Sequence, residues 1–434
     1  MNTRVLVFGL IAAMMILPLI TFAGGFQLNE HGARAMAVGG AFVARASDPS
    51  ALFFNPAGMS QLRGTQIMAG TTLIMPSFKF RGPTNYNVNT EVKMADQVFT
   101  PINFYATHTF DGGTLDGLAI GLGVYNPYGL GTKWDDNWVG KTITQETKLT
   151  TFFFSPTVSY AINDMISVGA GASYVLGDVK LRQAVTLFDP AMNLDLEGDG
   201  NGFGWNASIL VKPIDLLSVG FCYRSSVKLD LEGTAKFSNQ TTSMAALFPG
   251  GDVKTSIELP STFFAGIAFF PMDNLEIEVD YQGTGWSSYK QLDIDFVNDA
   301  TTDPNKVIKQ ADVSSPKNYE DSYIIRAGVE YNLVNAGLKL RGGFLYDKNP
   351  VPDAHVEPLL PDANRQGISF GLGYKVMPSL TIDASYLFLS FAQRTTTATS
   401  FDTRPTGGTD YGVYFDGTYN GTTHLIAIDF TYSL

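Results

Sequence analysis

The chain has 434 residues, of which 45% are hydrophobic, only 16% are charged and 44 are glycine. The formal net charge is −12, and no basic cluster is dense enough to follow a phosphate backbone, which excludes nucleic acid as a partner. High hydrophobicity with little charge and many glycines is typical of a protein built mainly of β-sheet.

Residues 1–23 have the pattern of a signal peptide. Arg4 supplies a positive charge, Val5 to Ile20 are apolar, and Ala23 is the small residue that signal peptidase requires. We therefore predict cleavage before Gly24 and export from the cytoplasm. The alternative is an uncleaved anchor helix, for which this apolar stretch is short. No run of about eighteen apolar residues follows, so any later membrane insertion must use strands.

Residues 24–64 differ from the rest of the chain. They are rich in alanine, glycine and short polar residues and carry little two-residue alternation, which predicts a separate compact element. Asp48 as N-cap and Pro49 at the first helical position predict the start of a short helix.

From Thr65 onward, apolar and polar residues alternate with the period of a strand that has one apolar and one polar face. The clearest examples are 275–282 and 424–434. The alternation predicts fourteen strands, near 65–80, 97–110, 117–126, 149–161, 165–182, 201–212, 216–237, 254–270, 275–295, 316–332, 337–346, 365–375, 380–394 and 418–434.

The connectors between these strands alternate between short turns and stretches of about sixteen to twenty-three residues. Short turns at one end and long loops at the other are typical of bacterial outer-membrane barrels. We therefore predict an all-β fold, a fourteen-stranded antiparallel transmembrane β-barrel over residues 65–434. A soluble secreted β-protein is the alternative, and its apolar faces would need a second sheet to pack on.

Charged residues on the polar face of three neighbouring predicted strands should point into the barrel lumen. Opposite charges on adjacent strands can pair there, so we interpret the set as structural ion pairs rather than a catalytic group. The residues are Glu276, Glu278, Asp280, Arg326, Lys339 and Arg341.

Four stretches resemble the FadL-type outer-membrane transporters of long-chain fatty acids and other hydrophobic compounds. Residues 25–30 resemble the mature N-terminus of that family, and Asn55-Pro56-Ala57 matches its Asn-Pro-Ala motif. Residues 341–353 resemble its late signature, which Pro361, Asp362 and Arg365 continue. The resemblance spans nearly the whole mature chain.

The resemblance implies that residues 24–64 fold inside the barrel as a small N-terminal hatch. It implies that Phe26 lies beside a bound ligand, although Phe26 could instead serve only hatch packing. It also implies that the ligand leaves sideways through a kink in the third strand, where Gly121, Gly123 and Pro127 permit distortion. The family has a basic residue before the tenth strand for a fatty-acid carboxylate; here Glu320 lies in that stretch, and only Lys317 could substitute.

Two predicted external loops carry many apolar residues, which favours a surface that captures hydrophobic ligands. Alternatively, the two loops pack on each other as a lid. The residues are Leu187, Phe188, Met192 and Leu194 in one loop, and Met244, Leu247 and Phe248 in the other.

Motifs for catalysis, metals and cofactors are absent from the sequence. The four histidines lack zinc spacing, Gly-x-Ser-x-Gly does not occur, and Asp195 to Gly200 imitates a calcium loop without its closing glutamate, so we interpret it as a solvated loop. Together with the resemblance to FadL-type transporters, these absences predict a monomeric outer-membrane protein, without enzyme activity or cofactor, that passively transports hydrophobic small molecules among outer-membrane lipid and lipopolysaccharide. A water-filled general porin is the alternative function.

Overall fold

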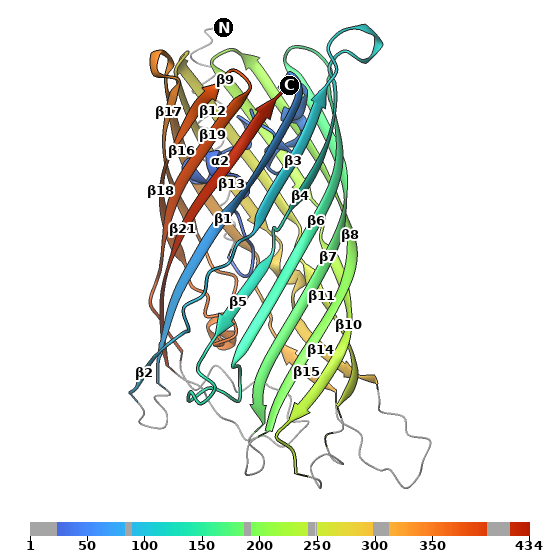
Figure 1. The fold of residues 1–434 in the computed structure, drawn as a ribbon, viewed down its shortest axis with the longest axis vertical. Coiled ribbons are helices and arrows are strands. Elements are labelled where there is room, and N and C mark those ends of the chain that lie inside the picture. Colours follow the sequence, from blue (N-terminus) through green and yellow to red (C-terminus); the bar gives the residue numbers. More distant parts are fainter. Residues whose placement is uncertain are drawn as a thin grey trace.

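The computed structural model describes residues 24–82, 89–185, 192–241, 248, 250–297, 312–396 and 417–434, and these form one closed antiparallel β-barrel (Figure 1). The predicted signal peptide lies outside the described residues, as do Leu187, Phe188, Met244 and Leu247. In the described part of the chain, no helix is both long and apolar enough to cross a bilayer.

Fourteen staves, each a single strand or two strands separated by a short break, form the wall in the described residues. The single-strand staves are β1 (Gly64–Arg81), β6 (Glu146–Ala161), β7 (Ile166–Val185), β8 (Met192–Ile214), β17 (Leu338–Asp347), β18 (Arg365–Met377) and β21 (Thr418–Ser433). The two-part staves are β2 (Glu91–Lys93) with β3 (Ile102–Thr109), β4 (Leu118–Tyr125) with β5 (Gly129–Lys133), β9 (Leu217–Arg224) with β10 (Val227–Ser238), β11 (Gly251–Leu259) with β12 (Thr262–Met272), β13 (Leu275–Thr284) with β14 (Gln291–Phe296), β15 (Val313–Pro316) with β16 (Ser322–Leu333), and β19 (Leu380–Phe391) with β20 (Arg394–Thr395).

The barrel closes because β1 pairs with β21 over the whole length of β21, from Gln66 opposite Ser433 to Arg81 opposite Thr418. Closure leaves no sheet edge whose N–H and C=O groups would face lipid. The prediction of a fourteen-stranded barrel is confirmed.

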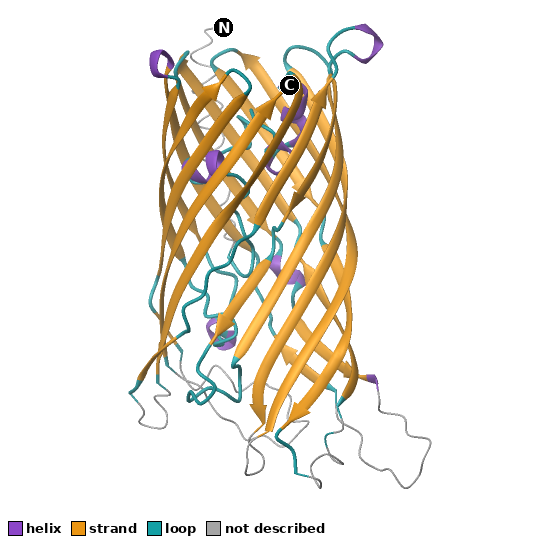
Figure 2. Cartoon of the chain, in the orientation of Figure 1, coloured by secondary structure: helices purple, strands orange, loops and turns teal. Residues whose placement is uncertain are grey.

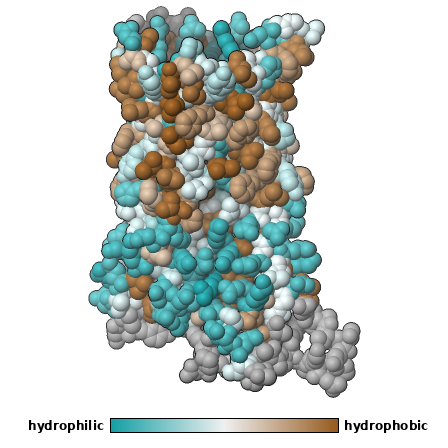
Figure 3. Space-filling model, viewed as in Figure 1, coloured by the Kyte–Doolittle hydropathy of each residue, from teal (hydrophilic) through white to brown (hydrophobic). Residues whose placement is uncertain are grey.

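The two faces of each strand follow the alternation in the sequence. On β21, Leu425 is 1% exposed and faces inward, whereas Ile426 is 46% exposed and faces outward. On the face of the barrel shown in Figure 3, outward residues form a broad hydrophobic zone, bordered on one side by a hydrophilic region. Stacked outward tyrosines such as Tyr281 and Tyr323, whose ring centroids are 5.9 Å apart, are typical of the aromatic girdles at membrane interfaces.

Short and long connections lie at opposite ends of the barrel (Figure 2). The short-turn end also holds the C-terminus and the 3-10 helices η3 (Gly113–Leu115) and η6 (Val334–Ala336). The 3-10 helix η4 (Trp286–Ser288) lies in the break between β13 and β14, and η7 (Asp353–His355) lies in the long connection between β17 and β18.

One predicted external loop is shorter than expected, because β7 and β8 continue beyond their expected ends as a long hairpin. Met192 pairs with Val185 in register, and Leu194 pairs with Gln183. Both apolar side chains are buried and belong to a strand rather than to a loop. The stretch from Asp195 to Gly200, expected to be a solvated loop, is part of the same strand.

Inside the barrel, residues 24–62 form a compact hatch with three short helical segments: α2 (Ala33–Ala37), α3 (Ala51–Phe54) and η1 (Pro56–Gln61). Figure 1 shows α2 within the barrel outline. The predicted helix starts slightly later than expected, because the Asp48 side chain accepts hydrogen bonds from the backbone N–H and hydroxyl of Ser50 and α3 begins at Ala51.

Candidate functional site

Inward carboxylates of the barrel hold the backbone of the hatch. Asp280 accepts hydrogen bonds from the N–H groups of Phe42 (2.7 Å) and Val43 (3.1 Å), and Glu278 accepts one from Ala44 (2.6 Å). Asp429 accepts another from Ala33. The barrel thus replaces the water that these buried donors lose on folding.

Two hatch arginines, Arg34 and Arg45, form ion pairs with inward carboxylates of the barrel. Arg34 Nε lies 2.8 Å from Glu330, and Arg45 Nε lies 2.8 Å from Glu278. The sequence reasoning missed both arginines, because the hatch has no periodicity that shows which side chains face the wall. Most of the lumen charges therefore fasten the hatch.

The three predicted lumen cations also have polar partners. Arg341 lies 2.6 Å from Glu330 on the neighbouring strand, and Lys339 lies 2.8 Å from the same carboxylate. Arg326 donates from Nη2 to Asn29 (3.0 Å) in the hatch and to Gln282 (2.7 Å). These cations are engaged within the protein.

The Asn55-Pro56-Ala57 motif joins the hatch to the wall. The Asn55 side chain accepts a hydrogen bond from Ala57 N–H and donates to the carbonyl oxygens of Val43 and Ile209. Pro56 occupies the first turn of η1, where its missing N–H costs nothing. Ala57 N–H also donates to the Ser208 hydroxyl, 2.9 Å away.

Replacing Asp280 with alanine should loosen the hatch without opening the barrel wall. Two buried N–H groups would lose their acceptor, at a cost of about 1–3 kcal/mol each. We expect faster hydrogen exchange at Phe42 and Val43, measured by mass spectrometry. Ser385→Ala is the control, because the Ser385 hydroxyl has no hydrogen-bond partner among the described residues; equal exchange in the two variants would contradict this role for Asp280.

The third stave is broken at residues 126–128, between β4 and β5. β5 pairs with β6 on one side, but no backbone hydrogen bond joins residues 129–132 to residues 96–101 of the preceding stave, all of which are described. The hatch partly covers the free edge, because Leu28 N–H donates to the Pro127 carbonyl and Gly129 N–H donates to the Phe26 carbonyl, both at 2.9 Å.

Gly121 and Gly123 do not lie at this break, contrary to the expectation that the strand distorts there. Both are in regularly paired β4, opposite Thr157 and Ser155. A Cβ on Gly121 would lie 2.9 Å from the Met59 sulfur of the hatch, and one on Gly123 would lie 2.8 Å from the Tyr125 ring. These glycines make room for side chains inside the barrel, and only Pro127 lies at the break.

A cavity of about 470 Å³ passes through the wall at the break. Residues on both faces of β6 line it, because Leu149 points into the barrel whereas Phe152 lies on the outer face. Val98, which is 59% exposed, lies at the outer mouth, and Phe26 of the hatch lies at the inner end. A cavity of this volume suits a small organic ligand.

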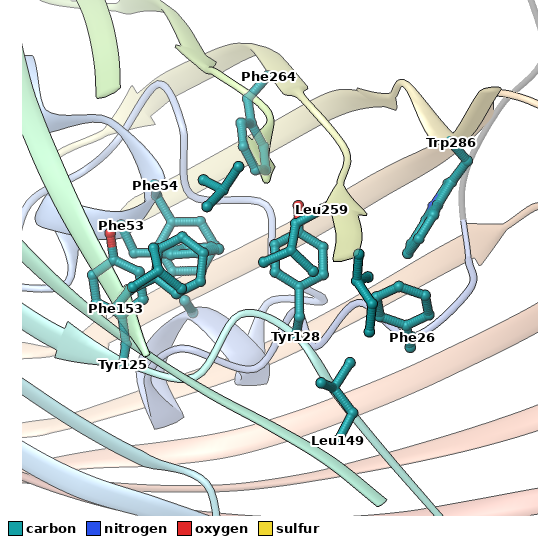
Figure 4. Packing of buried hydrophobic residues seen from close by; sticks show 14 of the residues in the cluster. Phe26, Phe53, Phe54, Tyr125, Tyr128, Leu149, Phe153, Leu259, Phe264 and Trp286 are labelled. Carbon is teal, nitrogen blue, oxygen red and sulfur yellow. The ribbon is translucent and has the colours of Figure 1, made fainter. Parts of the chain in front are cut away.

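Phe26 is held in a cage of aromatic rings at the inner end (Figure 4). Its ring centroid lies 4.6 Å from Trp286, 5.7 Å from Tyr289 and 6.2 Å from Tyr128, all in edge-to-face geometry. A smaller cavity of about 80 Å³ lies on another side of Phe26 and shares Leu149 with the larger one. The two cavities therefore lie side by side, with Phe26, Leu130, Leu149 and Leu360 in the walls of both.

Lys317, the candidate for binding a carboxylate, lies in the wall of the smaller cavity. Its Nζ is 3.0 Å from the Glu357 carboxylate, and both side chains are buried. Phe248 packs on Phe237, with ring centroids 5.4 Å apart. Neither Phe248 nor Met192 nor Leu194 lines these two cavities, as far as the described residues show.

The match to a family model decides the identity of this architecture. The model described as "Outer membrane protein transport protein (OMPP1/FadL/TodX)" matches residues 14–434. The chain belongs to this family. It is accordingly a protein of the bacterial outer membrane.

Relatives of this OMPP1/FadL/TodX member cover most of its length. The "47 kDa outer membrane protein" of Pasteurella multocida is 26% identical over 86% of this chain and 89% of its own. A "Long-chain fatty acid transport protein" of Escherichia coli is 24% identical over 87% of this chain and 90% of its own.

Solved structures share the fold at lower identity. A Pseudomonas aeruginosa FadL homologue has a TM-score of 0.79 and 20% identity over 94% of this chain and 99% of its own. The Pseudomonas putida toluene transporter TodX has a TM-score of 0.70 and 16% identity over 93% of this chain and 98% of its own.

Proposed function

We propose that the protein carries hydrophobic small molecules into the outer membrane by a sideways route through its wall. The observation that carries this proposal is the cavity lined by both faces of β6, with Leu149 inside and Phe152 outside. A ligand in this cavity would contact the hatch at one end and lipid at the other. The names of the relatives, which include fatty-acid and toluene transporters, support the same class of cargo.

The ligand would enter from the long-loop end and reach the smaller cavity first. Capture by the apolar loop residues stays a prediction, because Leu187, Phe188, Met244 and Leu247 lie outside the described residues. Displacement of Phe26 would then join the smaller cavity to the wall cavity, which both include Phe26 and Leu149 in their walls. Each methylene buried on this path contributes about 0.8 kcal/mol, so no energy source is required.

A sideways exit suits an apolar solute, because the solute passes from a protein cavity into lipid without crossing the polar lipopolysaccharide layer. We propose that the protein acts as a monomer, has no catalytic role, and loses residues 1–23 during export. Sequencing the N-terminus of the mature protein tests the last point, since we expect it to begin at Gly24.

The hatch argues against the alternative of a water-filled general porin. It fills the lumen with residues such as Phe42, Phe53 and Met59, which are almost completely buried. An open aqueous channel would need this space.

The preferred cargo is proposed to be uncharged. A carboxylate brought into a buried site needs a cation, but Lys317 already binds Glu357, while Lys339 and Arg341 bind Glu330. We expect purified protein to bind the methyl ester of a long-chain fatty acid at least as well as the free acid at neutral pH, measured by competition. A tenfold preference for the free acid, about 1.4 kcal/mol, would contradict an uncharged cargo.

A further inference from the structure

The inner end of the wall cavity is acidic although most of its lining is apolar. Glu30 of the hatch, Asp362 of the connection after β17 and Arg365 of β18 line this end. Asp362 is only 3% exposed. It accepts hydrogen bonds from the N–H groups of Gly25 (2.8 Å) and Ala363 (2.9 Å), which leaves further acceptor capacity on both oxygens.

Arg365 does not neutralise both acids of this end. Its Nε lies 2.7 Å and its Nη2 lies 2.6 Å from Asp347, a third carboxylate outside the cavity. Glu30 accepts a hydrogen bond from Asn29 N–H, and no ion pair of Glu30 or Asp362 is found within the described residues. The other charged residue of the lining, Lys148, lies on the outer face of β6 at the opposite mouth.

Three kinds of ligand would interact differently with the acidic inner end of the wall cavity. A carboxylate would face two acids with one already engaged guanidinium, so it would be repelled. A plain hydrocarbon would fill the apolar walls but displace water from carboxylate oxygens without offering a donor. A neutral hydroxyl would donate a charge-assisted hydrogen bond to one of these oxygens.

We propose that the wall cavity prefers hydrophobic ligands that carry a neutral hydrogen-bond donor, such as alkylphenols or long-chain alcohols, over the matching hydrocarbons and carboxylates. The donor end would lie against Asp362 and Glu30, and the apolar end would point toward Val98 and Phe152 at the mouth. This specificity rests on the proposed function of the same cavity.

The preference should weaken in acid. Burial raises the pKa of Asp362 to about 6, against the opposing effect of Arg365, and burial also raises the pKa of Glu30. The groups that face Asp362 are Gly25 N–H, Ala363 N–H, Arg365, Asp347 and Tyr319, while Arg394 bonds only its backbone carbonyl. The groups that face Glu30 are Asn29 N–H, Arg365 and Arg326. A phenol stays neutral from about pH 5 to about pH 8, whereas Asp362 changes from mostly protonated to ionised, so the phenol meets its strongest acceptor at the higher pH.

The test compares para-butylphenol, butylbenzene and para-butylbenzoate as competitors for a fluorescent hydrophobic probe on the purified full-length mature protein. At about pH 8 we expect the phenol to bind about tenfold more tightly than butylbenzene, or roughly 1.4 kcal/mol, and the benzoate to bind most weakly. In Asp362→Asn the ratio of phenol to hydrocarbon affinity should fall most of the way to one. Asp164→Asn, at an exposed turn, is the matched control and should keep the wild-type ratio.

Each result of this test either supports or overturns the proposed specificity. A wild-type ratio near one, a preference for the benzoate, or a full ratio in Asp362→Asn overturns the proposed specificity. If Asp362→Asn does not fold, Glu30→Gln and the fall of the wild-type ratio between about pH 8 and about pH 5 decide in its place. Failure of all three ligands to compete would instead overturn the proposed function.

Discussion

Two tryptophans at the outer mouth of the wall cavity, introduced as Thr100→Trp with Thr150→Trp, are expected to abolish most uptake of hydrophobic compounds. Both threonines line the cavity, and Thr150 lies on the outer face of β6. The indole rings would fill the space through which a ligand leaves. A barrier raised by only about 1.4 kcal/mol slows transport tenfold, so a filled mouth should slow it at least that much. Uptake of a radiolabelled alkane or alkylbenzene by cells that carry the variant gives the measurement.

The control places the same two side chains on lipid-facing positions away from the mouth. Ile120→Trp with Val158→Trp suits this purpose, because both residues are exposed on the outer faces of β4 and β6 and do not line the cavity. Both double variants should keep the heat-modifiable mobility of a folded barrel. Equal uptake in the two variants would rule out the sideways route.

Deleting residues 24–60 is expected to convert the closed barrel into an ion-conducting pore. The hatch fills the lumen, and its removal exposes Glu276, Glu278, Asp280 and Asp429 to water inside a barrel of fourteen staves. Barrels of eight strands are filled by their own side chains, whereas those of sixteen to eighteen leave an aqueous channel, so a lumen of intermediate size without its plug should conduct.

Planar-bilayer recordings should show stable open-pore steps for the deletion variant and none for the full chain. Unchanged conductance would mean that the hatch is not what closes the lumen. Asp280→Ala gives an intermediate case, because its hatch is loosened but present, and we expect only brief openings from it.

The strands could be predicted from the sequence because their signal is local. In β13 and β21, the period of the side chains follows directly from the backbone geometry, so Ile277 and Asp280 could be assigned to opposite faces without any other part of the chain. The first half of β8, residues 192–200, was not predicted, because the glycines between Gly198 and Gly204 dilute the alternation that Met192 and Leu194 continue.

The site could be predicted only in part, because long-range contacts form it. Pro127 marks the break in the third stave, but nothing near it in the sequence shows that Phe26 and Leu28 cover the open edge. Likewise, the acids Asp280 and Glu278 were assigned to the lumen, but their partners in the hatch, such as Arg45, lie more than two hundred residues away. Alternation reveals the direction of a side chain and not the partner that it meets.

The most direct test of the sideways route is the position of a bound ligand. A crystal of the mature protein soaked with a bromoalkylbenzene would locate the bromine by anomalous scattering. We predict a peak in the wall cavity, between Phe26 at the inner end and Val98 at the mouth, beside Leu149. A peak confined to the lumen on the axis of the barrel, or no peak in the wall cavity at a ligand concentration that saturates binding in solution, would contradict the account.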